Sequence, residues 1–174
     1  MNEYRKHKVY ARHSAVLPKD RLSISLIKRS VLAALRVMGM ELPCEVSVLV
    51  TDERSIREIN NEFRGVDKST DVLSFPMQEI TPMQSLTLDG WESVPGAAID
   101  PETGLMPLGE IIISAPQTIE QALKHGHSIE HETAYLTVHS VLHLLGFDHV
   151  DEGDNKKKMR DCEKAIMQEL GFEN

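Results

Sequence analysis

The chain has 174 residues, of which 41% are hydrophobic and 26% charged, and this size and composition predict one globular domain over residues 1–174 with its own buried core. No apolar run approaches the roughly 20 residues that a membrane-spanning helix needs, and the basic first residues lack the apolar segment of a secretory signal. We therefore expect a cytoplasmic protein with no membrane partner. Two cysteines do not make a disulfide framework, so both are expected to be reduced.

The net charge of −8 is distributed unevenly along the chain. Residues 1–36 carry nine Lys or Arg residues against two acidic ones, a local charge of +7, so the remainder carries −15. Such a split is typical of a protein that turns one surface toward a polyanion. The alternative is a basic helix face that is simply solvated.

Hydrophobic periodicity and capping residues predict nine elements. The first five, in chain order, are a strand at 9–13, a helix introduced by Pro18 and Asp20 that runs to about residue 38, a strand at 45–51, a helix capped by Asp52 that runs to about residue 63, and a short apolar strand at 72–76. After the 77–108 stretch come a strand at 109–114, a helix at 115–124, a helix from residue 129 that holds the histidines discussed next, and a last helix that starts within residues 151–155 and runs to 170. This order predicts the α+β class, a small mixed β-sheet of about four strands covered by about five helices.

The stretch at residues 77–108 stands apart from these elements. It contains seven Pro or Gly residues and five acidic residues, and no Lys or Arg. This composition predicts a long acidic loop or a hairpin excursion, and a connection of such length is usually functional or disordered. Its negative charge argues against contact with phosphate.

Three histidines near the C-terminus have the spacing of a metal site. His139 and His143 are four residues apart, so on a helix their imidazoles converge on one face. Gly146 then permits a reversal that would bring His149 back as a third ligand and leave a fourth position open. The alternative is three unrelated histidines, each satisfied by hydrogen bonds or solvent. We prefer metal ligands on one helix and the turn after it, because the histidine and glycine spacing is that of the metzincin pattern.

The residue after the first histidine argues against protease chemistry. A zinc peptidase places a general-base Glu there, and this chain has Ser140, which cannot take a proton from a zinc-bound water at neutral pH. Another acidic residue, Glu132, lies seven positions before His139 on the same helical face. It is interpreted either as a carboxylate that supports a ligand or as an acid that stabilises the start of the helix.

A second histidine pair at the same spacing, His127 and His131, is a rival metal site. We expect Ser128 to be the N-cap of the helix, which places His127 outside it. The pair would then lose its shared face, and on this ground we discount it. A further candidate, Arg64, follows a predicted helix; its guanidinium suits phosphate, but an arginine there can equally bond the last carbonyls of its own helix.

With these motifs in place, the chain resembles the YbeY family of zinc-dependent endoribonucleases, also called rRNA maturation factors. Three segments carry the resemblance: His-Ser-Val-Leu-His-Leu-Leu-Gly-Phe-Asp-His at 139–149, Phe-Arg at 63–64 followed by Thr-Asp-Val-Leu-Ser-Phe-Pro at 70–76, and Leu-Gly-Glu-Ile-Ile-Ile-Ser at 108–114. Ser140 stands where the family usually has Gly, and the 77–108 stretch is longer than the family suggests.

The resemblance implies one Zn²⁺ per chain on His139, His143 and His149, and a catalytic role for Arg64. It also implies a single-strand-specific endoribonuclease that acts in late processing of the 3′ end of small-subunit (16S) rRNA and in ribosome maturation. Its expected partners are RNA, ribosomal particles and ribosome-associated proteins. Two alternatives remain open: a metal-dependent hydrolase of another substrate such as a peptide, and a non-catalytic ribosome-assembly factor with a structural zinc.

Overall fold

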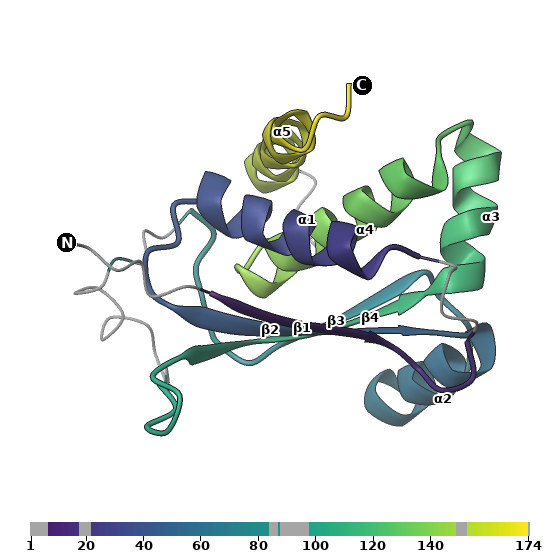
Figure 1. Ribbon diagram of the computed structural model, residues 1–174, viewed down its shortest axis with the longest axis horizontal. Coiled ribbons are helices and arrows are strands. Elements are labelled where there is room, and N and C mark those ends of the chain that lie inside the picture. The colour runs from purple at the N-terminus through teal and green to yellow at the C-terminus, as the bar shows by residue number, and fades with distance from the viewer. Residues whose placement is uncertain (1–6, 18–21, 84–86, 88–97, 149–152, 174) are drawn as a thin grey trace.

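The computed structural model describes residues 7–17, 22–83, 87, 98–148 and 153–173. Within these ranges four strands and five helices follow one another in the predicted order (Figure 1). The elements are β1 (Lys8–His13), α1 (Ile24–Val37), β2 (Cys44–Thr51), α2 (Glu53–Arg64), β3 (Val72–Pro76), β4 (Met106–Ser114), α3 (Ala115–His125), α4 (Ile129–Leu144) and α5 (Asp154–Glu169). The predicted α+β class is confirmed.

The four strands form one mixed sheet in the order β1-β2-β4-β3. β1, β2 and β4 are parallel, and β3 pairs antiparallel with β4 at the edge of the sheet. Parallel neighbours need long crossover connections, and α1 and α2 lie in those connections. The short strand β3 forms the edge of the sheet beside which the candidate site is built.

Helices cover the two faces of the sheet unequally (Figure 1). α1 and α4 lie on one face with α5 packed onto them, whereas α2 lies on the other face. Side chains of β4 enter the cores on both faces of the sheet, because successive side chains of a strand point to opposite faces. Ile111 and Ile113 enter the main core with α1 and α4, and Ile112 joins a small second core with Ile56 of α2.

Capping residues start the helices largely where the sequence predicts them. Asp52 accepts a hydrogen bond from the backbone amide of Ser55 (2.8 Å), and Ser114 accepts one from that of Gln117 (3.4 Å). For α1 the cap is Ser23, whereas the predicted Pro18 and Asp20 lie outside the described residues. Each cap satisfies an amide that has no partner inside its helix.

The segment after β3 continues the hairpin with β4. The Met77 amide donates to the Leu108 carbonyl (3.0 Å), and the Gln78 side chain donates to the Pro107 carbonyl (2.7 Å). The predicted acidic stretch at 77–108 is thus an excursion between two paired strands, and β4 already begins at Met106. Residues 84–86 and 88–97 of this stretch lie outside the described residues.

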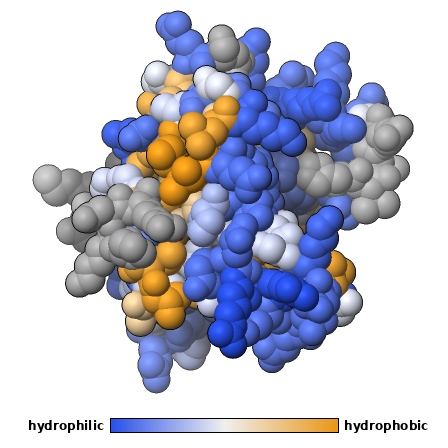
Figure 2. Space-filling model, turned by 90° about the vertical axis from the view of Figure 1, so that its right-hand side faces the viewer, coloured by the Kyte–Doolittle hydropathy of each residue, from blue (hydrophilic) through white to orange (hydrophobic). Residues whose placement is uncertain are grey.

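The side of the molecule seen in Figure 2 is mostly hydrophilic, and its hydrophobic side chains gather in limited patches. Among the helices of the described residues, none combines the length and the apolar character that crossing a membrane requires.

Candidate metal centre and the cleft around it

The helix α4 places His139 and His143 one turn apart on the same side. Its end is a tight turn in which the Gly146 amide donates to the His143 carbonyl and the Phe147 amide donates to the Leu142 carbonyl. This pair of bonds is a Schellman motif, and Gly146 has the positive φ of 95° that the motif needs. The reversal after α4 is therefore as predicted. The third predicted ligand, His149, follows this turn and lies outside the described residues.

The two imidazoles point their Nε2 atoms at each other, 3.0 Å apart. Their Nδ1 atoms are held from outside: that of His139 lies 2.7 Å from the Glu163 carboxylate, and that of His143 lies 2.7 Å from the Phe147 carbonyl oxygen. Carboxylates and carbonyls only accept hydrogen bonds, so these partners assign the proton of each neutral ring to Nδ1. Each Nε2 then presents a lone pair to the other. A shared cation removes that repulsion, and the arrangement is the one that metal-binding histidines adopt.

These histidines line a cleft of about 730 Å³ that also receives Arg64 and residues of β3. Arg64 is the last residue of α2, on the far face of the sheet, and its exposed side chain reaches the cleft around the β3 edge. Its Nη2 donates to the carbonyl of Ser74 (3.2 Å), and its guanidinium lies 5.8 Å from the centre of the Phe75 ring. The bond goes to β3, and the carbonyl of Asn61 at the end of α2 is satisfied by the amide of Gly65 instead. Arg64 thus faces the cleft that the histidines line.

Three further residues of the cleft, Asp71, Gln121 and Tyr135, had no role assigned from the sequence. The Asp71 carboxylate accepts hydrogen bonds from the Val72 amide (2.8 Å) and the Gln121 side chain (2.9 Å), so it ties the start of β3 to α3. The Tyr135 ring lies 5.9 Å from that of His139. Burial, followed by the charge of Glu163, raises the pKa of Tyr135 to about 12, so its phenol stays protonated at neutral pH.

The carboxylate that supports His139 is not the one that the sequence suggested. The carboxylate that supports His139 is Glu163 of α5, 24 residues away in sequence, and no local spacing signals it. Glu132 is buried and pairs with the His127 ring at 3.7 Å, so the interpretation that it supports His139 is wrong. Ser140 is fully buried and points away from the cleft lining, and its hydroxyl has no partner among the described residues.

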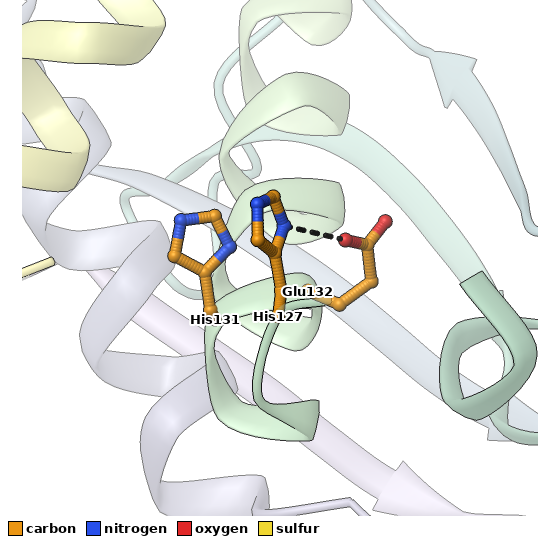
Figure 3. A group of neighbouring side chains, drawn as sticks. All are labelled: His127, His131 and Glu132. Atoms are coloured by element: carbon orange, nitrogen blue, oxygen red, sulfur yellow. Dashed lines mark ion pairs between the residues drawn. The ribbon is translucent and has the colours of Figure 1, made fainter. Parts of the chain in front are cut away.

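The second histidine pair also comes together, contrary to the sequence expectation. Ser128 is the N-cap of α4 as predicted, and His127 precedes it. The turn nevertheless folds His127 back, so that its ring centre lies 4.2 Å from that of His131 (Figure 3). Ligand atoms of His127, His131 and Glu132 all lie within 4.8 Å of one another, so these residues could hold a metal ion. Burial, and secondarily the neighbouring His127, lowers the pKa of His131.

Comparisons with known proteins agree on one family. A family model described as Endoribonuclease YbeY matches residues 11–171. Proteins named Endoribonuclease YbeY from Caldicellulosiruptor bescii and Caldanaerobacter subterraneus subsp. tengcongensis are 44% and 42% identical to this chain, over 84% and 85% of it and 86% and 87% of their own lengths. The solution structure of TM1509 from Thermotoga maritima aligns with a TM-score of 0.55 at 19% identity, over 94% of this chain and 92% of that one. At that identity the likeness concerns the fold alone.

Proposed function

We propose that this chain, which belongs to the Endoribonuclease YbeY family, is itself a metal-dependent endoribonuclease with one Zn²⁺ held by His139, His143 and His149. The observation that carries the proposal is the pair of Nε2 atoms facing each other at 3.0 Å, each ring braced at Nδ1 by an acceptor. Neutral imidazoles braced in this way are suited to zinc.

The chemistry follows from what the cleft residues offer. A bound zinc ion would supply Lewis acidity for the cleavage of a phosphodiester. Arg64 would bind a phosphate oxygen through the N–H groups that it does not give to Ser74, and its charge would stabilise the charge that develops there. Glu163 would keep the proton of His139 on Nδ1, so that Nε2 stays a ligand. Tyr135 would keep its phenolic proton and could donate it in a hydrogen bond.

The absence of an acid at position 140 is compatible with RNA as the substrate. RNA carries its own 2′-hydroxyl nucleophile, so a peptidase-type general base after the first histidine is not required. The buried Ser140 side chain does not reach the cleft lining and cannot serve as one. This favours RNA over a peptide. We propose single-stranded RNA, specifically the 3′ end of small-subunit (16S) rRNA during ribosome maturation, as the substrate.

The test of this function is His143→Ala, assayed for zinc content and for cleavage of a single-stranded RNA oligonucleotide. The variant should lose one zinc per chain and about 10²–10⁴-fold of its activity, since metal stabilisation of a transition state amounts to several kcal/mol. Arg64→Ala should lose activity and keep its zinc. His125→Ala, an exposed histidine outside the cleft, is the matched control. Full cleavage by His143→Ala would contradict the proposal, and loss of zinc without loss of cleavage would favour a structural ion.

The basic residues near the N-terminus provide a second test, on RNA binding. Lys8 and Arg12 are exposed on β1, whereas Lys6 lies outside the described residues. Neutralising Lys6, Lys8 and Arg12 should weaken RNA binding and reduce the salt dependence of the affinity by a slope of about 0.7 for each phosphate that is no longer neutralised. Lys124→Gln, on the exposed surface of α3, is the control. Binding that does not depend on salt would contradict an electrostatic role for this segment.

A further inference from the structure

We propose that His127, His131 and Glu132 form a second zinc site, distinct from the His139–His143 centre. The three residues occupy the turn before α4 and its first turn, and their ligand atoms lie within 4.8 Å of one another. His131 and His139 are eight residues apart, so the two sites are separated by about 12 Å along the helix. One ion cannot serve both.

The geometry of the cluster is close to that of a bound ion. Figure 3 shows the His127 ring between the His131 ring and the Glu132 carboxylate, with a nitrogen of His131 turned toward His127. In a tetrahedral zinc site the ligand atoms lie about 3.4 Å apart, given the usual zinc–nitrogen and zinc–oxygen bond lengths. In the cluster the His127 and Glu132 ligand atoms are 3.7 Å apart and all the ligand atoms lie within 4.8 Å of one another, so binding an ion requires side-chain shifts of at most about 1.4 Å in any separation.

The buried polar atoms of the cluster lack adequate partners. The Nδ1 atom of His131 is buried and has no hydrogen-bond partner among the residues that the structure describes. The carboxylate of Glu132 is buried, and its ion pair with His127 is long at 3.7 Å. Unpaired buried polar groups are rare, and buried charges are usually paired or bound to a metal. A divalent cation would satisfy both residues.

The charge balance of the cluster also permits a cation. The N-terminus of a helix carries a partial positive charge, which by itself disfavours a metal ion at this position. Glu132 lies in that first turn of α4 together with the exposed Glu130, and the two carboxylates offset the helix charge. Two neutral imidazoles and one carboxylate are the ligand set of several zinc enzymes, whereas Mg²⁺ and Ca²⁺ prefer oxygen ligands alone.

Room for a fourth ligand exists on the outer side of the cluster. A cavity of about 340 Å³ is lined by His127, Ser128, His131 and the C-terminal residues Phe172 and Glu173. The Phe172 ring meets that of His131 edge to face, with ring centres 5.5 Å apart. Water or the Glu173 carboxylate can therefore complete a tetrahedral site. An ion here would hold the turn between α3 and α4, and the C-terminal segment, against the helix that carries the other two histidines.

The experiment counts zinc in the full-length protein after removal of metal with a chelator, reloading with Zn²⁺ and dialysis. The wild type should hold two ions per chain, His131→Ala one, His143→Ala one and the double variant none. His127→Gln, at an exposed position that does not threaten folding, should also hold one. His125→Ala is the matched control, because it changes a neighbouring exposed histidine, the last residue of α3, that lies outside the cluster, and it should hold two.

A second measurement separates ligation from damage to the fold. In the His143→Ala background only the proposed cluster remains, so Zn²⁺ should raise the thermal unfolding temperature of that variant and not of the double variant. Replacing zinc with Co²⁺ in the same background should give the visible absorption of a tetrahedral ion. A wild type whose single ion is lost in His143→Ala and kept in His131→Ala, or a second ion that survives both His131→Ala and His127→Gln, would overturn the proposal. Neither measurement depends on nuclease activity, so the failure of one proposal is distinguishable from the failure of the other.

Discussion

Two histidine pairs with the same four-residue separation lie on or beside α4, and the structure treats them differently. His139 and His143 are both helical, and their outer nitrogens are braced by Glu163 of α5 and by the Phe147 carbonyl. His127 precedes the helix, is exposed, and meets His131 across the N-cap residue Ser128. In the second pair, neither ring forms a hydrogen bond with the described residues. The His127 ring has only its ion pair with Glu132 there.

The difference shows how equal spacing yields unequal sites. Bringing two imidazoles together needs only a helix or a tight turn, both of which are local. Orienting them for a metal needs acceptors on the far nitrogens: for His139 the acceptor is Glu163 of another helix, and for His143 it is the Phe147 carbonyl in the turn that ends α4. We therefore expect the His139–His143 centre to bind zinc more tightly than the cluster of His127, His131 and Glu132.

The largest difference between the two regions should be in unfolding free energy, when the glycine after α4 or the glycine after α3 is replaced. Gly146 follows α4, and a Cβ there would overlap the carbonyl oxygen of Ile80, whereas nothing lies within 4 Å of a Cβ at Gly126 after α3. Both have a positive φ. Gly126→Ala should cost about 1 kcal/mol of unfolding free energy, and Gly146→Ala about 3 kcal/mol or more, because overpacking adds to the backbone strain. Denaturant titration of both variants measures this, and equal losses would contradict it.

Replacing Glu163 or Glu132 with glutamine should give an effect of intermediate size. Each replacement should lower the zinc affinity of a different site. Glu163→Gln keeps an acceptor near His139 but removes the charge, so zinc affinity at the His139–His143 centre should fall about 10–100-fold. Glu132→Gln should leave that centre unchanged and weaken only the cluster. Competition with a chromophoric chelator, in His131→Ala and His143→Ala backgrounds respectively, reports each site alone. A loss at the His139–His143 centre caused by Glu132→Gln would mean that the two sites are coupled.

The smallest effect should be a difference in acid release of zinc. Both sites need neutral imidazoles, so each loses its ion as the pH falls and protons compete for two histidines. The more weakly braced cluster should release zinc at the higher pH, by about half a pH unit for each tenfold difference in affinity when two protons replace one ion. Zinc release followed with an indicator dye in the same two backgrounds measures the shift. Release in the reverse order would contradict the ranking of the two sites.

The parts of this protein that the sequence predicted correctly depend on short-range interactions. The strand at residues 45–51 follows from alternating valines, and the starts of three helices follow from Asp52, Ser114 and Ser128, each of which caps an amide three residues later. The pairing of His139 with His143 follows from the helical repeat alone. Family resemblance through short motifs belongs to the same category, since each motif is a contiguous run of residues.

The predictions for Glu132 and His127 were wrong because helical periodicity was used to predict contacts between side chains. Glu132 shares a helical face with His139, but seven residues span about 10 Å of helix, too far for a hydrogen bond. His127 was expected to lie away from His131 because it is outside the helix, yet the two ring centres lie 4.2 Å apart across the N-cap residue Ser128. Periodicity describes directions on a regular helix and says nothing of the turn that precedes it.

The sequence by itself therefore determined the elements, their order, and the two histidines of α4 that face one another. Only the tertiary structure decided which groups surround them: Glu163 from α5, Arg64 from the opposite face of the sheet, and Asp71 anchored by Gln121 at the same edge. The physical reason is that these contacts join residues tens of positions apart. They depend on the β1-β2-β4-β3 strand order and on how α4 and α5 pack, and no local spacing encodes either.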